Sequence, residues 1–101
     1  MPSFGVEVPH TLGREQAIER LKGFLNRVAE HYKDQVSQLD GQWKDNVMSF
    51  QLKTFGLTLT GDLVVEDDRA RIDGQLPFAA VAFRGKIQES IREELEKALK
   101  P

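Results

Sequence analysis

The chain has 101 residues, of which 40% are hydrophobic and 30% charged, and its net charge is −2. This composition argues against a disordered or fibrous chain and predicts one globular domain over residues 1–101. The slightly acidic balance differs from the basic surface of nucleic-acid-binding proteins, so no nucleic-acid partner is expected. The absence of cysteine excludes disulfides, thiolate nucleophiles and thiolate metal sites.

The start of the chain, MPSFGVEVPHTLG, has neither a basic segment nor an apolar run of signal-peptide length. The longest apolar run, at residues 78–83, is far shorter than the roughly 20 residues that span a bilayer. We therefore expect a soluble cytoplasmic protein without a membrane span.

Apolar residues at Phe4, Val6 and Val8 alternate with other residues near the N-terminus. This period of two predicts a short strand, which Pro9 ends. A helix is predicted next, from Arg14 to Lys33, with Thr11 as its N-cap. Residues spaced by three and four give this helix one apolar stripe, made of Ala17, Ile18, Leu21, Phe24, Leu25, Val28 and Tyr32.

From Val36 onward the apolar period changes to two and predicts four consecutive antiparallel strands. Two-residue turns are expected between them, at Asp45-Asn46, Phe55-Gly56 and Asp67-Asp68. The intervening residues form a polar face that includes Gln38, Asp40, Gln42, Ser49, Gln51, Thr58, Thr60, Asp62, Arg71 and Asp73. One apolar and one polar face predict a sheet covered on a single side.

The turns also predict the strand register. Opposite neighbours should be Trp43 and Met48, Gly41 and Phe50, Phe50 and Gly61, and Gly61 and Gly74. A row of glycines beside one phenylalanine therefore crosses the inner face of the sheet. Glycine weakens a strand unless its missing side chain is used. Either Phe50 and a helix pack closely over the row, or the row keeps a cavity open for a ligand.

The C-terminal segment begins with LPFAAVAF and ends in an amphipathic, charged sequence. Proline is suited to the first turn of a helix, so one helix is predicted from Pro77 to Leu99, with a bend at Gly85. Its apolar stripe contains Phe83, Ile87, Ile91, Leu95 and Leu99. The first two turns are apolar on most sides and should be buried or engaged by a partner.

These elements define an α+β fold with the order βαββββα. We expect one two-layer domain, in which two helices cover one face of the antiparallel sheet, as in a helix-grip architecture.

No residue pattern predicts catalysis, a cofactor or a metal. His10 is expected to tie a loop to the sheet, and His31 to interact with the C-terminal dipole of the first helix. Neither histidine has the partners of a metal site. The acidic run Glu66-Asp67-Asp68 is interpreted as a solvated turn, because neighbouring strand residues point to opposite faces.

Several local sequences resemble a known family: VPHTLGREQAIERL, GQW, GDLVVEDD and LPFAAVAF. The resemblance covers nearly the whole chain and is to the putative polyhydroxyalkanoic acid system protein family, a family of small bacterial proteins also linked to polyhydroxyalkanoate granules. This family often has a tryptophan after its Leu-Pro, where this chain has Phe78. The resemblance implies a connection with polyester storage, but it implies no catalytic residues.

Three functional hypotheses follow. The first is a non-enzymatic accessory protein that binds the granule surface or another granule-associated protein through Phe78, Val81 and Phe83. The second is a binding protein for a small apolar ligand, held between the sheet and the last helix. Its site would involve Trp43, Phe50, Gly61 and Gly74.

The third hypothesis is a structural module that forms a homodimer. The last helix or the polar sheet face would supply the interface, since the sheet has free edges at which self-association is physically available.

Overall fold

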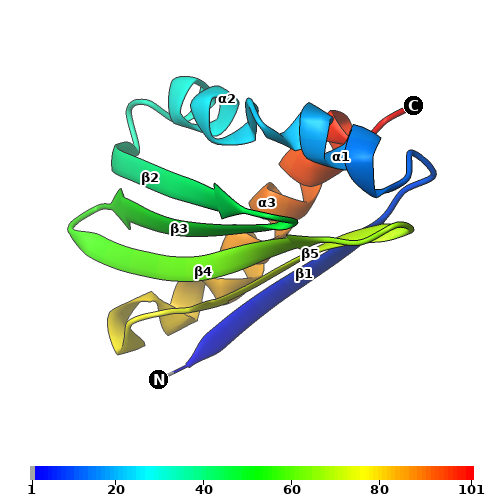
Figure 1. Ribbon diagram of the computed structural model, residues 1–101. Coiled ribbons are helices and arrows are strands. Elements are labelled where there is room, and N and C mark those ends of the chain that lie inside the picture. The colour runs from blue at the N-terminus through cyan, green and yellow to red at the C-terminus, as the bar shows by residue number, and fades with distance from the viewer. Residues whose placement is uncertain (1) are drawn as a thin grey trace.

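The computed structural model describes residues 2–101 and contains one antiparallel sheet with its helices packed on one side (Figure 1). The elements in chain order are β1 (Ser3–Pro9), α1 (Arg14–Leu21), α2 (Phe24–His31), β2 (Val36–Lys44), β3 (Val47–Thr54), β4 (Leu57–Val65), β5 (Arg69–Gln75), the 3₁₀ helix η1 (Phe78–Phe83) and α3 (Arg84–Ala98). The α+β class and the antiparallel sheet with helices on one face are therefore confirmed.

The five strands lie in the order β1-β5-β4-β3-β2, and every neighbouring pair is antiparallel. The N-terminal strand joins the far side of the meander, so β1 and β2 form the two edges. The predicted register is confirmed at every named pair: Trp43 with Met48, Gly41 with Phe50, Phe50 with Gly61, and Gly61 with Gly74. The three two-residue turns fix it.

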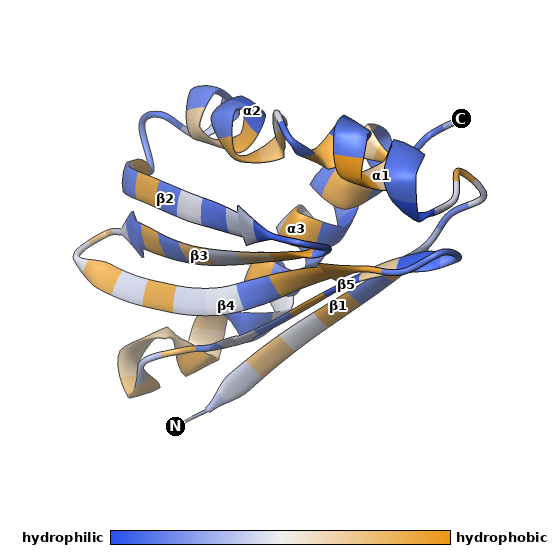
Figure 2. Ribbon diagram, in the orientation of Figure 1, coloured by the Kyte–Doolittle hydropathy of each residue, from blue (hydrophilic) through white to orange (hydrophobic). Residues whose placement is uncertain are grey.

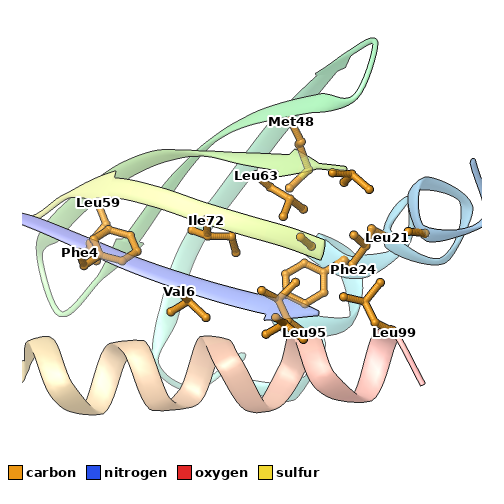
Figure 3. Packing of buried hydrophobic residues seen from close by; sticks show 14 of the residues in the cluster. Phe4, Val6, Leu21, Phe24, Met48, Leu59, Leu63, Ile72, Leu95 and Leu99 are labelled. Carbon is orange, nitrogen blue, oxygen red and sulfur yellow. The ribbon is translucent and has the colours of Figure 1, made fainter. Parts of the chain in front are cut away.

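The core lies between the inner face of the sheet and the helices (Figure 3). Burial alternates along β1, where Phe4, Val6 and Val8 are buried and the residues between them are exposed. The stripe predicted for the first helical segment faces the same core, which also receives Leu95 and Leu99 from α3. Figure 2 shows the alternation of polar and apolar residues along the strands that produces the one-sided packing.

The prediction of one unbroken helix from Arg14 to Lys33 is wrong. The chain turns at residues 22–23 and forms two short helices, of which α1 packs against β4 and α2 packs against β2. Gly23, with φ −91° and ψ 2°, is the N-cap of α2. The guanidinium of Arg27 donates to the carbonyl of Arg20 across the break at 2.8 Å. The apolar stripe continues through the break, so periodicity alone did not reveal it.

Thr11 is not the N-cap of the first helix. The helix begins at Arg14 as predicted, but the residue before it is Gly13, which has φ 80° and offers no side-chain cap. A positive φ suits glycine because it has no Cβ.

The prediction of one helix from Pro77 to Leu99 is also wrong. The first six residues after Pro77 form the 3₁₀ helix η1, and the α-helix begins at Arg84. The sequence of η1, FAAVAF, is apolar throughout and has no stripe that could distinguish three residues per turn from 3.6. The change of helix type falls at the Phe83–Arg84 junction rather than as a bend at Gly85.

Within residues 2–101, no helix combines the length and the apolar character needed to cross a bilayer.

Candidate functional site

Three large apolar side chains project into solvent at one end of the sheet. Phe55 is 79% exposed, Phe78 is 85% exposed and Phe83 is 58% exposed. Phe55 lies in the β3–β4 turn, and the other two lie at the ends of η1. Because β4 begins and β5 ends at this side of the sheet, the turn and η1 lie at the same end of the molecule (Figure 1). We call Phe55, Phe78, Val81 and Phe83 the apolar end.

Buried neighbours hold η1 so that its phenylalanines remain outside. Leu76, just before η1, is fully buried, and Ala80 within it is 1% exposed. The amide of Leu76 donates to the carbonyl of Pro2, and that of Ala80 donates to the carbonyl of Pro77, both at 2.9 Å. Leu76 and Ala80 are thus inside the core and hold η1 in place, while Phe78 is exposed. Val81 is half-buried.

Phe55 was not identified as a site residue by the sequence analysis. Phe55 and Gly56 both have positive φ, 52° and 77°. This pair of angles is typical of a type I′ hairpin turn, in which asparagine, aspartate and glycine are preferred. A bulky residue at positive φ is uncommon and costs backbone energy. The signal available in the sequence was therefore a phenylalanine at a turn position that seldom carries one.

The inner face becomes less buried toward the apolar end and toward β2. Leu59 is 1% exposed, but its register neighbours Leu52 and Leu39 are only half-buried, as is Leu57 beside the β3–β4 turn. The corner of the sheet next to Phe55 therefore adds accessible apolar surface to the apolar end.

The other four candidate residues lie in the middle of the sheet. Trp43 and Phe50 are half-buried members of the inner face, and Gly61 and Gly74 are neighbours in the row that crosses it. Phe78, Val81 and Phe83 thus lie together in η1, whereas this central group lies in the strands β2 to β5.

Side chains fill the space above the glycine row. A Cβ placed on Gly61 would lie 2.9 Å from Phe50 Cζ, and one on Gly74 would lie 2.5 Å from Phe4 Cε1. A Cβ on Gly41 would overlap Leu25 Cδ1 of α2. These distances favour the interpretation in which aromatic rings and a helix pack on the glycines.

His10 connects the start of the chain to the β4–β5 turn, as the sequence predicted. The residue is 8% exposed, and its backbone amide donates to the carbonyl of Asp68 at 2.9 Å. The imidazole Nδ1 accepts from the amide of Leu12 at 3.2 Å, and Nε2 is 2.9 Å from the carbonyl of Glu66. An amide can only donate and a carbonyl can only accept, so the proton must be on Nε2.

Charges at the β4–β5 turn are paired with one another and open to solvent. Arg69 donates to Glu7 at 3.0 Å and to Asp68 at 3.2 Å. The hydrogen bonds from Arg69, and then its charge, hold the pKa of Asp68 below its ordinary value. In the part of the chain described, no three His, Asp or Glu side chains gather as metal ligands would.

A second polar group joins α2 to α3. Glu94 is mostly buried, and its Oε1 lies 3.5 Å from the hydroxyl of Tyr32 and 3.9 Å from His31 Nδ1. Burial, followed by the charge of Glu94, raises the pKa of Tyr32. These contacts link the end of α2 to the last helix.

The fold and its surface define a small α+β protein whose most distinctive exposed feature is apolar. Residues 5–99 match the family described as putative polyhydroxyalkanoic acid system protein, and the chain therefore belongs to that family. The search of curated proteins gave no match for this chain.

Proposed function

We propose that this chain is a non-enzymatic, cytoplasmic accessory protein of a polyhydroxyalkanoate storage system and that it attaches to the polyester surface through its apolar end. The observation that carries the proposal is the exposure of Phe78, Phe83 and Phe55 at one end of the fold. Membership of the family supports the storage context. Exposed apolar patches commonly mark sites of interaction with a partner or an apolar surface.

The energetics agree with reversible attachment. Fully burying a phenylalanine side chain is worth about 1.5–3 kcal/mol. Burying three phenylalanine side chains is worth more free energy than burying one, but association also costs translational and rotational freedom. Attachment should therefore depend on several phenylalanines together, and one substitution should weaken it without abolishing it.

Co-sedimentation with isolated polyester granules tests this proposal, with uncoated hydrophobic beads as a parallel sample. The variant that replaces Phe55, Phe78 and Phe83 by serine should remain in the supernatant. A control variant carrying Thr58→Ala, Thr60→Ala and Gln51→Ala changes exposed residues of the polar face and should bind as the natural chain does.

Granule binding that survives the triple serine substitution would overturn the proposal. Granules stripped of their proteins distinguish binding to the polyester itself from binding to a granule-associated protein. Binding that is lost on stripping would identify a granule-associated protein as the partner and contradict direct contact with the polyester.

Self-association is the second candidate, favoured by the difference between the sheet edges. At the β1 edge, the amide of Gly5 donates to Gln88 Oε1 of α3 at 3.0 Å. At the β2 edge, Gly41 is exposed, and all its exposed surface is backbone because glycine has no side chain. An open strand edge can pair with another chain. Sedimentation of a single monomeric species at high concentration would exclude this homodimer.

A further inference from the structure

The charged residues near the apolar end are mainly basic. The β3–β4 turn is flanked by Lys53, and η1 is followed by Arg84 and Lys86. Lys33 lies in the loop before β2, which reaches the same end because Val36 pairs with Thr54 and the hydroxyl of Thr54 donates to the carbonyl of Gln35. Four cations therefore lie in segments at the same end of the sheet as the exposed phenylalanines.

None of these four cations forms an ion pair within residues 2–101. The ion pairs of the fold involve other cations. Arg14, Arg69 and Arg71 pair with carboxylates of β1, β5 and the β4–β5 turn. Lys22 pairs with Glu19, and His31 and Lys97 pair with Glu94. The four cations at this end are thus not neutralised by a carboxylate of the described chain.

The balance of charge at this end is opposite to that of the whole chain. Glu30, Asp34 and Glu89 are the carboxylates within three residues of the four cations in sequence, so four cations stand against three carboxylates and this end has a small positive excess. The complete chain has 14 Lys and Arg against 16 Asp and Glu. The remaining surface therefore has a larger negative excess than the chain average.

Exposed aromatic side chains with basic residues nearby are suited to a surface that has an apolar layer and a negatively charged boundary. The rings enter an apolar layer, and the cations meet negative groups at its boundary. An uncharged polyester would use only the first of these interactions. We propose that the apolar end binds a surface of anionic phospholipid, with Phe55, Phe78 and Phe83 inserted among the acyl chains and Lys33, Lys53, Arg84 and Lys86 against the phosphates. This inference rests on the proposed attachment through the same end and specifies the surface.

Vesicle co-sedimentation tests the proposal directly. The probes are vesicles of phosphatidylcholine alone and vesicles in which about a third of the lipid is phosphatidylglycerol. The natural chain should bind the anionic vesicles at least about tenfold more tightly, and added salt should weaken that binding. Equal binding to both vesicles, or no binding to either, would overturn the proposal.

Charge variants test which cations are responsible. The double variant Lys53→Gln and Lys86→Gln should weaken binding to anionic vesicles by about fivefold for each cation lost. The control, Lys97→Gln with Lys100→Gln, makes the same change of net charge at the other end of α3 and should bind as the natural chain does. Equal weakening in both variants would show a dependence on net charge alone and contradict the site.

These experiments distinguish a failure of the lipid-surface proposal from a failure of the proposed attachment to polyester. Bare polyester that retains the natural chain, combined with vesicles that do not, overturns the lipid surface and leaves polyester attachment standing. Vesicle binding that depends on the two lysines but not on Phe55, Phe78 and Phe83 overturns attachment through the phenylalanines.

Discussion

The ring of Phe50 lies directly over Gly61, so closely that a Cβ on residue 61 would be 2.9 Å from Phe50 Cζ and 2.6 Å from the carbonyl oxygen of Asp73. The glycine is thus required by the packing of a neighbouring strand. It allows the half-buried side chain of Phe50 to pack against the sheet where a larger residue at position 61 would displace it.

Replacing Gly61 by alanine should therefore destabilise the fold. The added methyl group meets backbone as well as the ring, and overpacking of this kind costs about 1–3 kcal/mol. Urea unfolding monitored by circular dichroism measures the change. Gly85→Ala is the matched control, because its Cβ meets nothing within 4 Å and alanine favours a helix. That variant should gain about 0.5–1 kcal/mol, and equal destabilisation of both variants would contradict the packing argument.

His10 should carry its proton on Nε2 throughout the range in which it is neutral. The nitrogen-15 shifts of the imidazole distinguish the two tautomers, and a proton on Nδ1 would contradict the hydrogen bonds with Leu12 and Glu66. His10→Ala leaves those two backbone groups without their partner and should cost about 1–3 kcal/mol. The exposed His31 is the control, and its replacement by alanine should change stability by less than about 0.5 kcal/mol.

Tyr32 should ionise above the ordinary pKa of a tyrosine. Burial and the charge of Glu94 both raise the pKa of its hydroxyl. The chain has one tyrosine, so the absorbance of tyrosinate reports this residue alone. Glu94→Gln should lower the pKa but leave it above the ordinary value, because burial remains. An unchanged pKa would exclude Glu94 as a cause.

The same shift sets a direction for stability at alkaline pH. Below the pKa of the unfolded chain, Tyr32 is neutral in both states and contributes no pH dependence. As the pH rises past that value, the unfolded state loses its proton first and is favoured. Stability should thus fall with rising pH until the folded state also ionises, and Tyr32→Phe should remove this part of the fall.

Leu76 and Phe78 are two residues apart, but truncating them should change the stability of the fold by very different amounts. Leu76 is fully buried, so Leu76→Ala removes core packing and should cost about 2–5 kcal/mol. Phe78 is 85% exposed, and Phe78→Ala should change stability by less than about 0.5 kcal/mol. Thermal unfolding of both variants checks this. Strong destabilisation by Phe78→Ala would show that the ring is part of the core rather than of the apolar end.

Part of the candidate site was predictable. The segment FAAVAF is too apolar for an ordinary exposed helix, which identifies Phe78, Val81 and Phe83 as candidates for a partner surface. Their exposure was not predictable, because Phe78 and Ala80 stand in similar sequence surroundings and only one is buried. The contribution of Phe55 depends on the β3–β4 turn lying at the same end of the sheet as η1, although the two are more than 20 residues apart in the chain.

The sequence by itself determined the strands, their register and the face each residue takes, because side chains alternate strictly along a strand and two-residue turns allow no slippage. It did not determine where the helices break. The stripe of the first helical segment passes through Gly23 unchanged, and η1 has no stripe at all. Only the tertiary structure decided these points, since packing on a curved sheet selects the break at Gly23 and buries Ala80 while leaving Phe78 and Phe83 outside.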